Sequence, residues 1–144
     1  MRPEALRTPG LARQLAAMLY DALVVIALWF AAAVPVVLIL GGPPASTAAR
    51  ALFQAYLLAV AFGFFGYFWV HGGQTLGMRA WRLRLESADD GTVRWRQAGL
   101  RFGVAIVSGL ALGLGYLWRY IDPERRGWHD RASGTRLRLL PKPR

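Results

Sequence analysis

Two long apolar runs constrain the fold of this chain more than any other feature. Between residues 14 and 40 the only charged side chain is Asp21, and residues 51–70 carry no charge at all. Crossing a bilayer as a helix takes roughly 20 apolar residues, so either run is long enough. The sequence therefore predicts a single integral membrane domain over residues 1–144, all-α in class, with full transmembrane helices at about 12–40 and 50–70.

The first run follows a basic arm, residues 1–13, as the apolar part of a secretory signal peptide also does. That part of a signal peptide has about 7–15 residues. Here the run is much longer and contains Asp21, so we expect a retained helix. Gly41-Gly42-Pro43-Pro44 predicts a tight loop at its end.

A third apolar stretch, at about 97–121, is weaker. Its uncharged part, residues 102–118, has 17 residues, at the lower limit for a span. Gly109, Gly113 and Gly115 offer places for a break. The stretch is therefore either a plain third span or a broken element, re-entrant or lying in the interface, that returns to the side it came from.

The distribution of basic residues predicts the orientation. Three bases lie in residues 1–13, one between the first two helices, five in residues 71–97 and eight from Arg119 onward. Short loops rich in Lys and Arg stay in the cytoplasm. The first three numbers place the N-terminus and residues 71–97 there. A broken third element would keep the eight-base tail, mostly residues 122–144, in the cytoplasm, whereas a plain span would export it. The charge rule therefore favours the broken form.

Residues 81–96 alternate in character on both sides of an Asp-Gly pair. Trp81, Leu83 and Leu85 alternate with charged residues before it, and Val93 and Trp95 do so after it. Alternation around Asp-Gly predicts a β-hairpin. Residues 135–139 show the same period and could add a third strand. Because the bases flank apolar runs, we expect them to meet anionic lipid headgroups, and not nucleic acid.

Asp21 is the residue with the strongest functional implication. It lies about 12 Å beyond Arg13 along the first helix, where a charge is costly in hydrocarbon. We expect it to be protonated, paired with a base such as Arg101 or Arg119, or facing a polar interior. Two hypotheses follow: a site for a proton or cation, or a structural carboxylate that pins helices together.

The sequence offers little for catalysis or metal binding. There are no Cys, which excludes disulfides and thiolate sites, and the two His are too few for a His-rich metal site. For His129-Asp130 no nucleophile is apparent, and adjacent residues rarely orient each other as an acid–base dyad. The glycine-rich loop at 72–77 lacks the Lys-Ser/Thr of a phosphate-binding loop. We therefore expect no enzyme activity, no cofactor and no metal.

Several motifs together resemble the RDD family of small bacterial membrane proteins, named for one Arg and two Asp. The positions that carry the resemblance are Arg13, Asp21, the loop Gly73-Gln74-Thr75-Leu76-Gly77, and the C-terminal His129, Asp130, Gly134 and Thr135. Met78 departs from the basic residue expected after the loop, although Arg79 is next to it. The resemblance covers about residues 11–140.

The resemblance implies a multi-pass protein of the bacterial cytoplasmic membrane, without an established activity. Transport, including cation/proton exchange, has been suggested for the family. The alternative is a membrane scaffold or accessory subunit whose Arg and Asp residues form ion pairs. Two or three short spans enclose only a small cavity. A transporter of this size would therefore need to form a homo-oligomer or join another membrane protein. We expect Arg13, Asp21 and Asp130 to form one polar cluster at the cytoplasmic side, with the Gly73–Gly77 loop close by.

Overall fold

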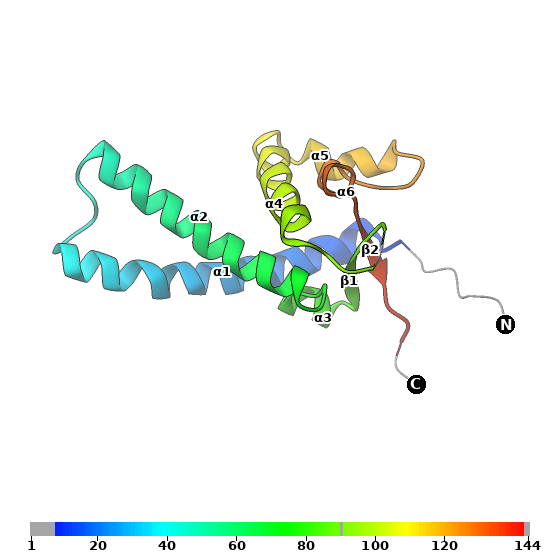
Figure 1. Ribbon diagram of the computed structural model, residues 1–144, viewed down its shortest axis with the longest axis horizontal. Helices are drawn as coiled ribbons and strands as arrows, with labels where there is room; N and C mark the ends of the chain where they lie inside the picture. The colour runs from blue at the N-terminus through cyan, green and yellow to red at the C-terminus, as the bar shows by residue number, and fades with distance from the viewer. Residues whose placement is uncertain (1–7, 90, 143–144) are drawn as a thin grey trace.

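Two long antiparallel helices form the body of the protein. The computed structural model describes residues 8–89 and 91–142, so most of the predicted basic arm lies outside it. Helices α1 (Leu11–Leu40) and α2 (Thr47–Val70) are both long and apolar enough to cross a membrane. The Trp29 indole donates to the Leu57 carbonyl across the pair, at 2.8 Å. Figure 1 shows their connecting loop at one end of the molecule and the start of α1 at the other.

The third apolar stretch forms helices that meet at a bend of 107°: α4 (Trp95–Leu110), α5 (Leu114–Leu117) and the 3-10 turn η1 (Trp118–Tyr120). The break falls at Leu112 and Gly113, whose φ angles of 57° and 76° lie in the left-handed region. In Figure 1, α5 runs back towards the end of the molecule at which α1 begins. The bend leaves Leu112 91% exposed. A broken third element was predicted, and its apolar tip suits a lipid environment.

The predicted hairpin at 81–96 is wrong. Strand β1 (Leu83–Ser87) pairs antiparallel with β2 (Thr135–Leu139), with Leu83 opposite Leu139. The expected second strand, residues 92–96, instead leads into α4, because the Gln97 side chain accepts a hydrogen bond from the Arg94 amide at 3.0 Å and so caps that helix. Asp90, in the expected turn, lies outside the described residues. The segment 135–139, predicted as an additional strand, is the true partner.

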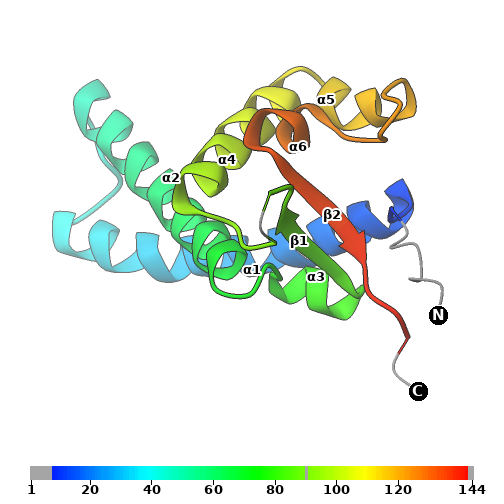
Figure 2. The same cartoon turned by 45° about the vertical axis from the view of Figure 1, so that its right-hand side comes forward.

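The small sheet closes one end of the helical pair. Its inner side chains, Leu83, Leu85 and Leu137, are buried against Ala17 of α1 and Trp69 of α2. Its outer face is charged, and Glu86 pairs there with Arg138 at 2.8 Å. Figure 2 shows the strands beside α1 and the short helix α3 (Leu76–Ala80), while α6 (Trp128–Ser133) leads into β2. The sheet and short helices thus form a polar layer over the ends of the spans.

This arrangement predicts which segments face the same side of the membrane. The chain has no Cys, so single substitutions Thr8→Cys, Ala45→Cys and Lys142→Cys can each be labelled alone. In intact cells, we expect Ala45→Cys to react with an impermeant maleimide, because the loop lies opposite the sheet, and the other two to react only after lysis. Labelling of Lys142→Cys in intact cells would contradict a third element that returns to its own side.

Candidate functional site

Asp21 is bound by the loop that follows α2. Its carboxylate accepts hydrogen bonds from the Thr75 hydroxyl at 2.5 Å and from the Gly77 amide at 2.8 Å. Asp21 is 3% exposed and Thr75 is fully buried. Hydrogen bonds to a buried carboxylate are strong and costly to lose. These contacts therefore fix α3 against the first half of α1.

The contact between α3 and Asp21 requires particular residues in the Gly73–Gly77 loop. Thr75 also caps α3, accepting from the Met78 amide at 3.2 Å, and the Gln74 side chain donates to the Leu83 carbonyl at 2.7 Å. A Cβ on Gly77 would lie 2.1 Å from the Ala17 carbonyl oxygen, and Gly73 has φ +70°. Both positions thus exclude larger residues, one by close approach and the other by backbone conformation.

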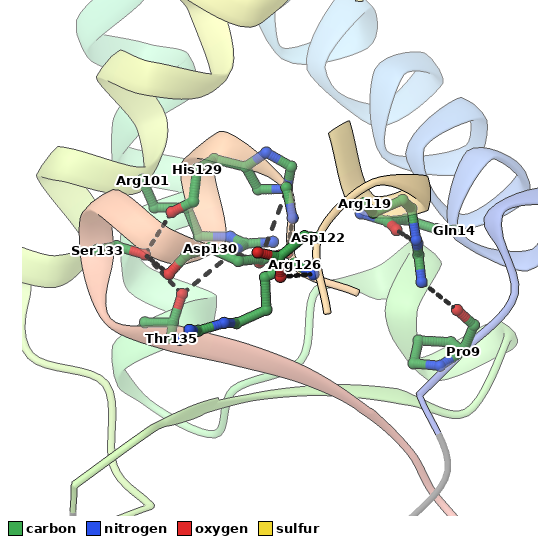
Figure 3. A network of polar contacts seen from close by, with 11 residues as sticks. Pro9, Gln14, Arg101, Arg119, Asp122, Arg126, His129, Asp130, Ser133 and Thr135 are labelled. Atoms are coloured by element: carbon green, nitrogen blue, oxygen red, sulfur yellow. Dashed lines mark hydrogen bonds and ion pairs between the residues drawn. The ribbon is translucent and has the colours of Figure 1, made fainter. Parts of the chain in front are cut away.

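Asp130 forms a second buried cluster (Figure 3). It makes an ion pair with Arg101 of α4 and accepts from the Gly127 amide at 3.1 Å. Arg101 also donates to the Thr135 hydroxyl at 3.1 Å. Gly134, with φ +65°, ends α6 so that β2 can begin at Thr135. Burial alone would raise the pKa of Asp130, but the Arg101 guanidinium holds that pKa below its ordinary value of 3.8.

His129 is buried beside this cluster without hydrogen bonds to either ring nitrogen. Its Nε2 lies 3.7 Å from Asp130 Oδ1, too far for a hydrogen bond. Its ring packs on Tyr116, with 4.6 Å between ring centroids. Burial, reinforced by the Arg101 charge, lowers the pKa of His129 to about 4, so the ring is neutral at pH 7.

A third contact ties the start of α1 to the end of the broken element. Arg119 of η1 hydrogen-bonds to the Gln14 side-chain oxygen and donates to the Pro9 carbonyl at 2.5 Å. Figure 3 shows Arg119 directed towards these two residues, apart from the Asp130 group. The broken element therefore returns to the level at which α1 begins.

The expected single cluster of Arg13, Asp21 and Asp130 is wrong. Asp21 is joined to the loop, as predicted, but Asp130 has a different partner. No hydrogen bond or ion pair links Arg13 to either acid within residues 8–89 and 91–142, where Arg13 is half-buried. Neither base suggested for Asp21 pairs with it, because Arg101 pairs with Asp130 and Arg119 faces Gln14. The two acids have separate partners because different elements pack against them: the loop and α3 against Asp21, and α4 against Asp130.

A partly open cavity of about 370 Å³ lies between α1, α2 and α4. Most of its wall is apolar, and its polar or titratable members are Gln14, Asp21, Arg101, Tyr116 and His129. Across the described segments no group of three or more His, Cys, Asp or Glu side chains is placed to hold a metal ion. The cavity is thus suited to an organic ligand, a proton or a monovalent ion.

The family model of the RDD family matches residues 8–134, most of the chain. The chain belongs to the RDD family. No curated protein and no solved structure was found to match it. In this RDD protein the sequence motifs acquire physical roles: the first Asp is held by the glycine loop, and the second pairs with Arg101.

Sequence reasoning missed several residues of the site. Arg101 was considered only as a partner for Asp21, and Tyr116 was not considered. Ser133, whose hydroxyl lies 2.7 Å from that of Thr135, gave no signal in the sequence beyond its position next to Gly134 and Thr135 of the C-terminal motif. A buried Arg in an apolar stretch signals a buried acid, but sequence spacing does not identify which acid.

The close approach at Gly77 predicts a sharp response to one methyl group. Gly77→Ala should push α3 away from α1 and break the amide bond to Asp21, lowering the free energy of unfolding by about 2–4 kcal/mol. Thermal unfolding in detergent measures the loss. Gly63→Ala is the matched control, because a Cβ there meets nothing within 4 Å. Equal melting temperatures for the two variants would contradict the packing described.

The buried neutral His129 predicts acid sensitivity. Because its pKa falls from 6.5 to about 4 on folding, the unfolded chain binds more protons between these values. The free energy of unfolding should therefore fall as the pH drops from about 6.5 to 4, by on the order of 3 kcal/mol. His129→Phe, which keeps a ring against Tyr116, should flatten this slope in denaturant titrations. An unchanged slope would show that His129 is not the group responsible.

Proposed function

We propose that this RDD protein is a transport component of the bacterial cytoplasmic membrane in which Asp21 exchanges a proton for a cation. One observation carries the proposal: Asp21 is a buried acid of a membrane helix that lines a cavity and makes no ion pair among the described residues. Ionisable residues inside a membrane are costly and are usually retained for function.

The hydrogen bonds of Asp21 support an exchangeable site. An ionised carboxylate can accept about four hydrogen bonds, and two are made here, by Thr75 and Gly77. The remaining lone pairs can take a proton or face a bound cation. Because both donors are neutral, no fixed positive charge competes with the cation for Asp21.

The charge distribution supports a cytoplasmic position for the polar layer. Exposed bases gather on this layer. Arg50 instead lies in the first turn of α2, next to the loop that connects the two spans. By the positive-inside rule, the N-terminus and the sheet face the cytoplasm. The outward side chains Arg84 and Arg136 of the sheet then lie where they can meet anionic headgroups. The cavity is bounded by one chain's few helices, so we expect the working unit to be an oligomer.

A structural role is the second candidate, and the same hydrogen bonds favour it. Asp21 holds α3 on α1, and Asp130 holds α4 to α6 and β2. Two such buried structural contacts would make the protein a rigid scaffold or accessory subunit. No nucleophile–base pair is found among the described site residues, and catalysis is no part of either proposal.

Asp21→Asn separates the two candidates. The variant keeps the side-chain shape and one carbonyl acceptor but cannot carry the charge. The assay uses proteoliposomes with an internal pH dye and an imposed pH gradient. We expect Na⁺ or K⁺ pulses to drive proton movement through the native protein, and the rate of this movement to be at least tenfold lower with Asp21→Asn.

Asp89→Asn is the control, because Asp89 is an exposed acid outside the cavity, and it should exchange normally. If the native protein gives no exchange and Asp21→Asn lowers the melting temperature by several degrees, the scaffold is the correct function. If Asp21→Asn exchanges as fast as the native protein, Asp21 is not the titrating site.

A further inference from the structure

We propose that the cavity between α1, α2 and α4 is a binding site for a lipophilic organic cation, paired with Asp21 and enclosed by aromatic rings. The inference rests on the proposed function in one respect, since it uses Asp21 as the ion site. It goes further by naming the chemical class of the ligand.

The size and lining of the cavity favour an organic molecule over a bare metal ion. A volume of about 370 Å³ falls within the range of small-molecule sites, roughly 300–1,000 Å³. Hard metal ions require several oxygen ligands, whereas Asp21 is the only acid of the described wall. A ligand that fills this space must therefore be mostly apolar.

The charge balance of the wall sets the sign of the ligand. Two described wall residues carry a formal charge, Asp21 and Arg101. Arg101 is compensated by its ion pair with Asp130, and His129 is neutral at pH 7. Arg119 lies outside the wall and is directed at Gln14 and Pro9. When it is ionised, Asp21 is thus an uncompensated negative charge in the described wall, which a monovalent cation would balance.

Aromatic rings complete the site. Trp29, Phe65, Trp69 and Phe102 all contribute to the wall. Ring faces attract cations, with the largest effect in sites shielded from water. A contact of this kind is present in the wall, where the Arg101 guanidinium carbon lies 5.4 Å from the centre of the Trp69 ring. A delocalised cation, which is weakly hydrated, would gain both the ring contacts and apolar burial.

His129 supplies a second, independent indication of a ligand. It is 2% exposed, it lines the cavity, and neither ring nitrogen has a hydrogen-bond partner. Buried polar groups are normally satisfied, so an unpartnered one at a cavity wall suits a ligand that bonds to it. The neutral ring can donate from one nitrogen and accept at the other, which would orient a polar substituent of the ligand.

Binding at this site must compete with protonation of Asp21. The groups facing Asp21 from neighbouring elements are Thr75 and the Gly77 amide, and the wider wall adds Gln14, Arg101, Tyr116 and His129. A proton on Asp21 removes the charge that holds the cation. The affinity for a cation should therefore fall as the pH falls, and at a pH where Asp21 is protonated before binding, one proton should leave for each cation bound.

Tetraphenylphosphonium is a suitable probe, because it is a compact delocalised cation with no hydrogen-bonding groups. With the full chain in detergent, equilibrium dialysis at pH 8 should show saturable binding to the native protein. Asp21→Asn should bind at least tenfold more weakly, and Asp89→Asn should bind normally. Native affinity should drop severalfold towards pH 6, and this pH dependence should be absent in Asp21→Asn. Triphenylphosphine oxide, a neutral molecule of similar shape, should bind far less tightly.

A second pair of variants tests the cavity itself. Ala105→Phe fills the wall of the cavity and should weaken binding, whereas Val107→Phe, at an exposed position of the same helix that is not in the wall, should not. Melting temperatures identify any variant that has lost its fold. Equal binding to the native protein, Asp21→Asn and Ala105→Phe would overturn the inference, as would equal affinity for the neutral probe.

The outcomes also separate this inference from the proposed function. If Asp21-dependent exchange of Na⁺ or K⁺ occurs but the phosphonium cation does not bind, the ligand class is wrong and the transport role stands. If the cation binds in an Asp21-dependent way and no ion or probe moves in proteoliposomes, the site exists but the protein is not a transporter.

Discussion

Asp21 needs hydrogen-bond donors from within the protein, because neither lipid nor an apolar helix face can supply them. The Thr75 hydroxyl and the Gly77 amide meet that need. To bring them there, α2 must end at the level of Asp21, the chain must turn back through Gly73, and α3 must approach α1 too closely for a side chain on Gly77. The path of the chain from residue 70 to 80 thus follows from the solvation of one carboxylate.

Asp130, which is also buried, fixes the C-terminal part of the chain as Asp21 fixes residues 70–80. Asp130 and Thr135 converge on Arg101, which lies in the second turn of α4. A buried Arg without an acid would cost several kcal/mol, so the C-terminal motif and the broken third element stabilise each other. Asp21 and Asp130 thereby fasten different parts of one polar layer to the helices, and the cavity lies between these attachments.

The spans were predictable because hydrophobic length is a local property: residues 14–40 and 51–70 lie within α1 and α2. The break near Gly113 was also signalled locally, since glycine tolerates positive φ. The hairpin prediction was wrong because alternation identifies the buried face of a strand but not the strand that pairs with it. In addition, Gln97 caps α4, so residues 94–97 begin a helix instead of a strand. The partners of Asp21 and Asp130 depend on tertiary packing, since they are separated from these acids by 54 and 29 positions.

The pairing of β1 with β2 has a consequence for biosynthesis. Leu83 is opposite Leu139, 56 positions later, and four helical elements are made between the two strands. While the ribosome is still adding them, β1 has an unpaired edge and its leucines lack Leu137 as a cover. The two spans can enter the membrane as they emerge, whereas the polar layer must wait for nearly all of the described chain. Insertion and completion of the fold are therefore separate events in time, and a chaperone or the membrane surface would have to shield that edge in the interval.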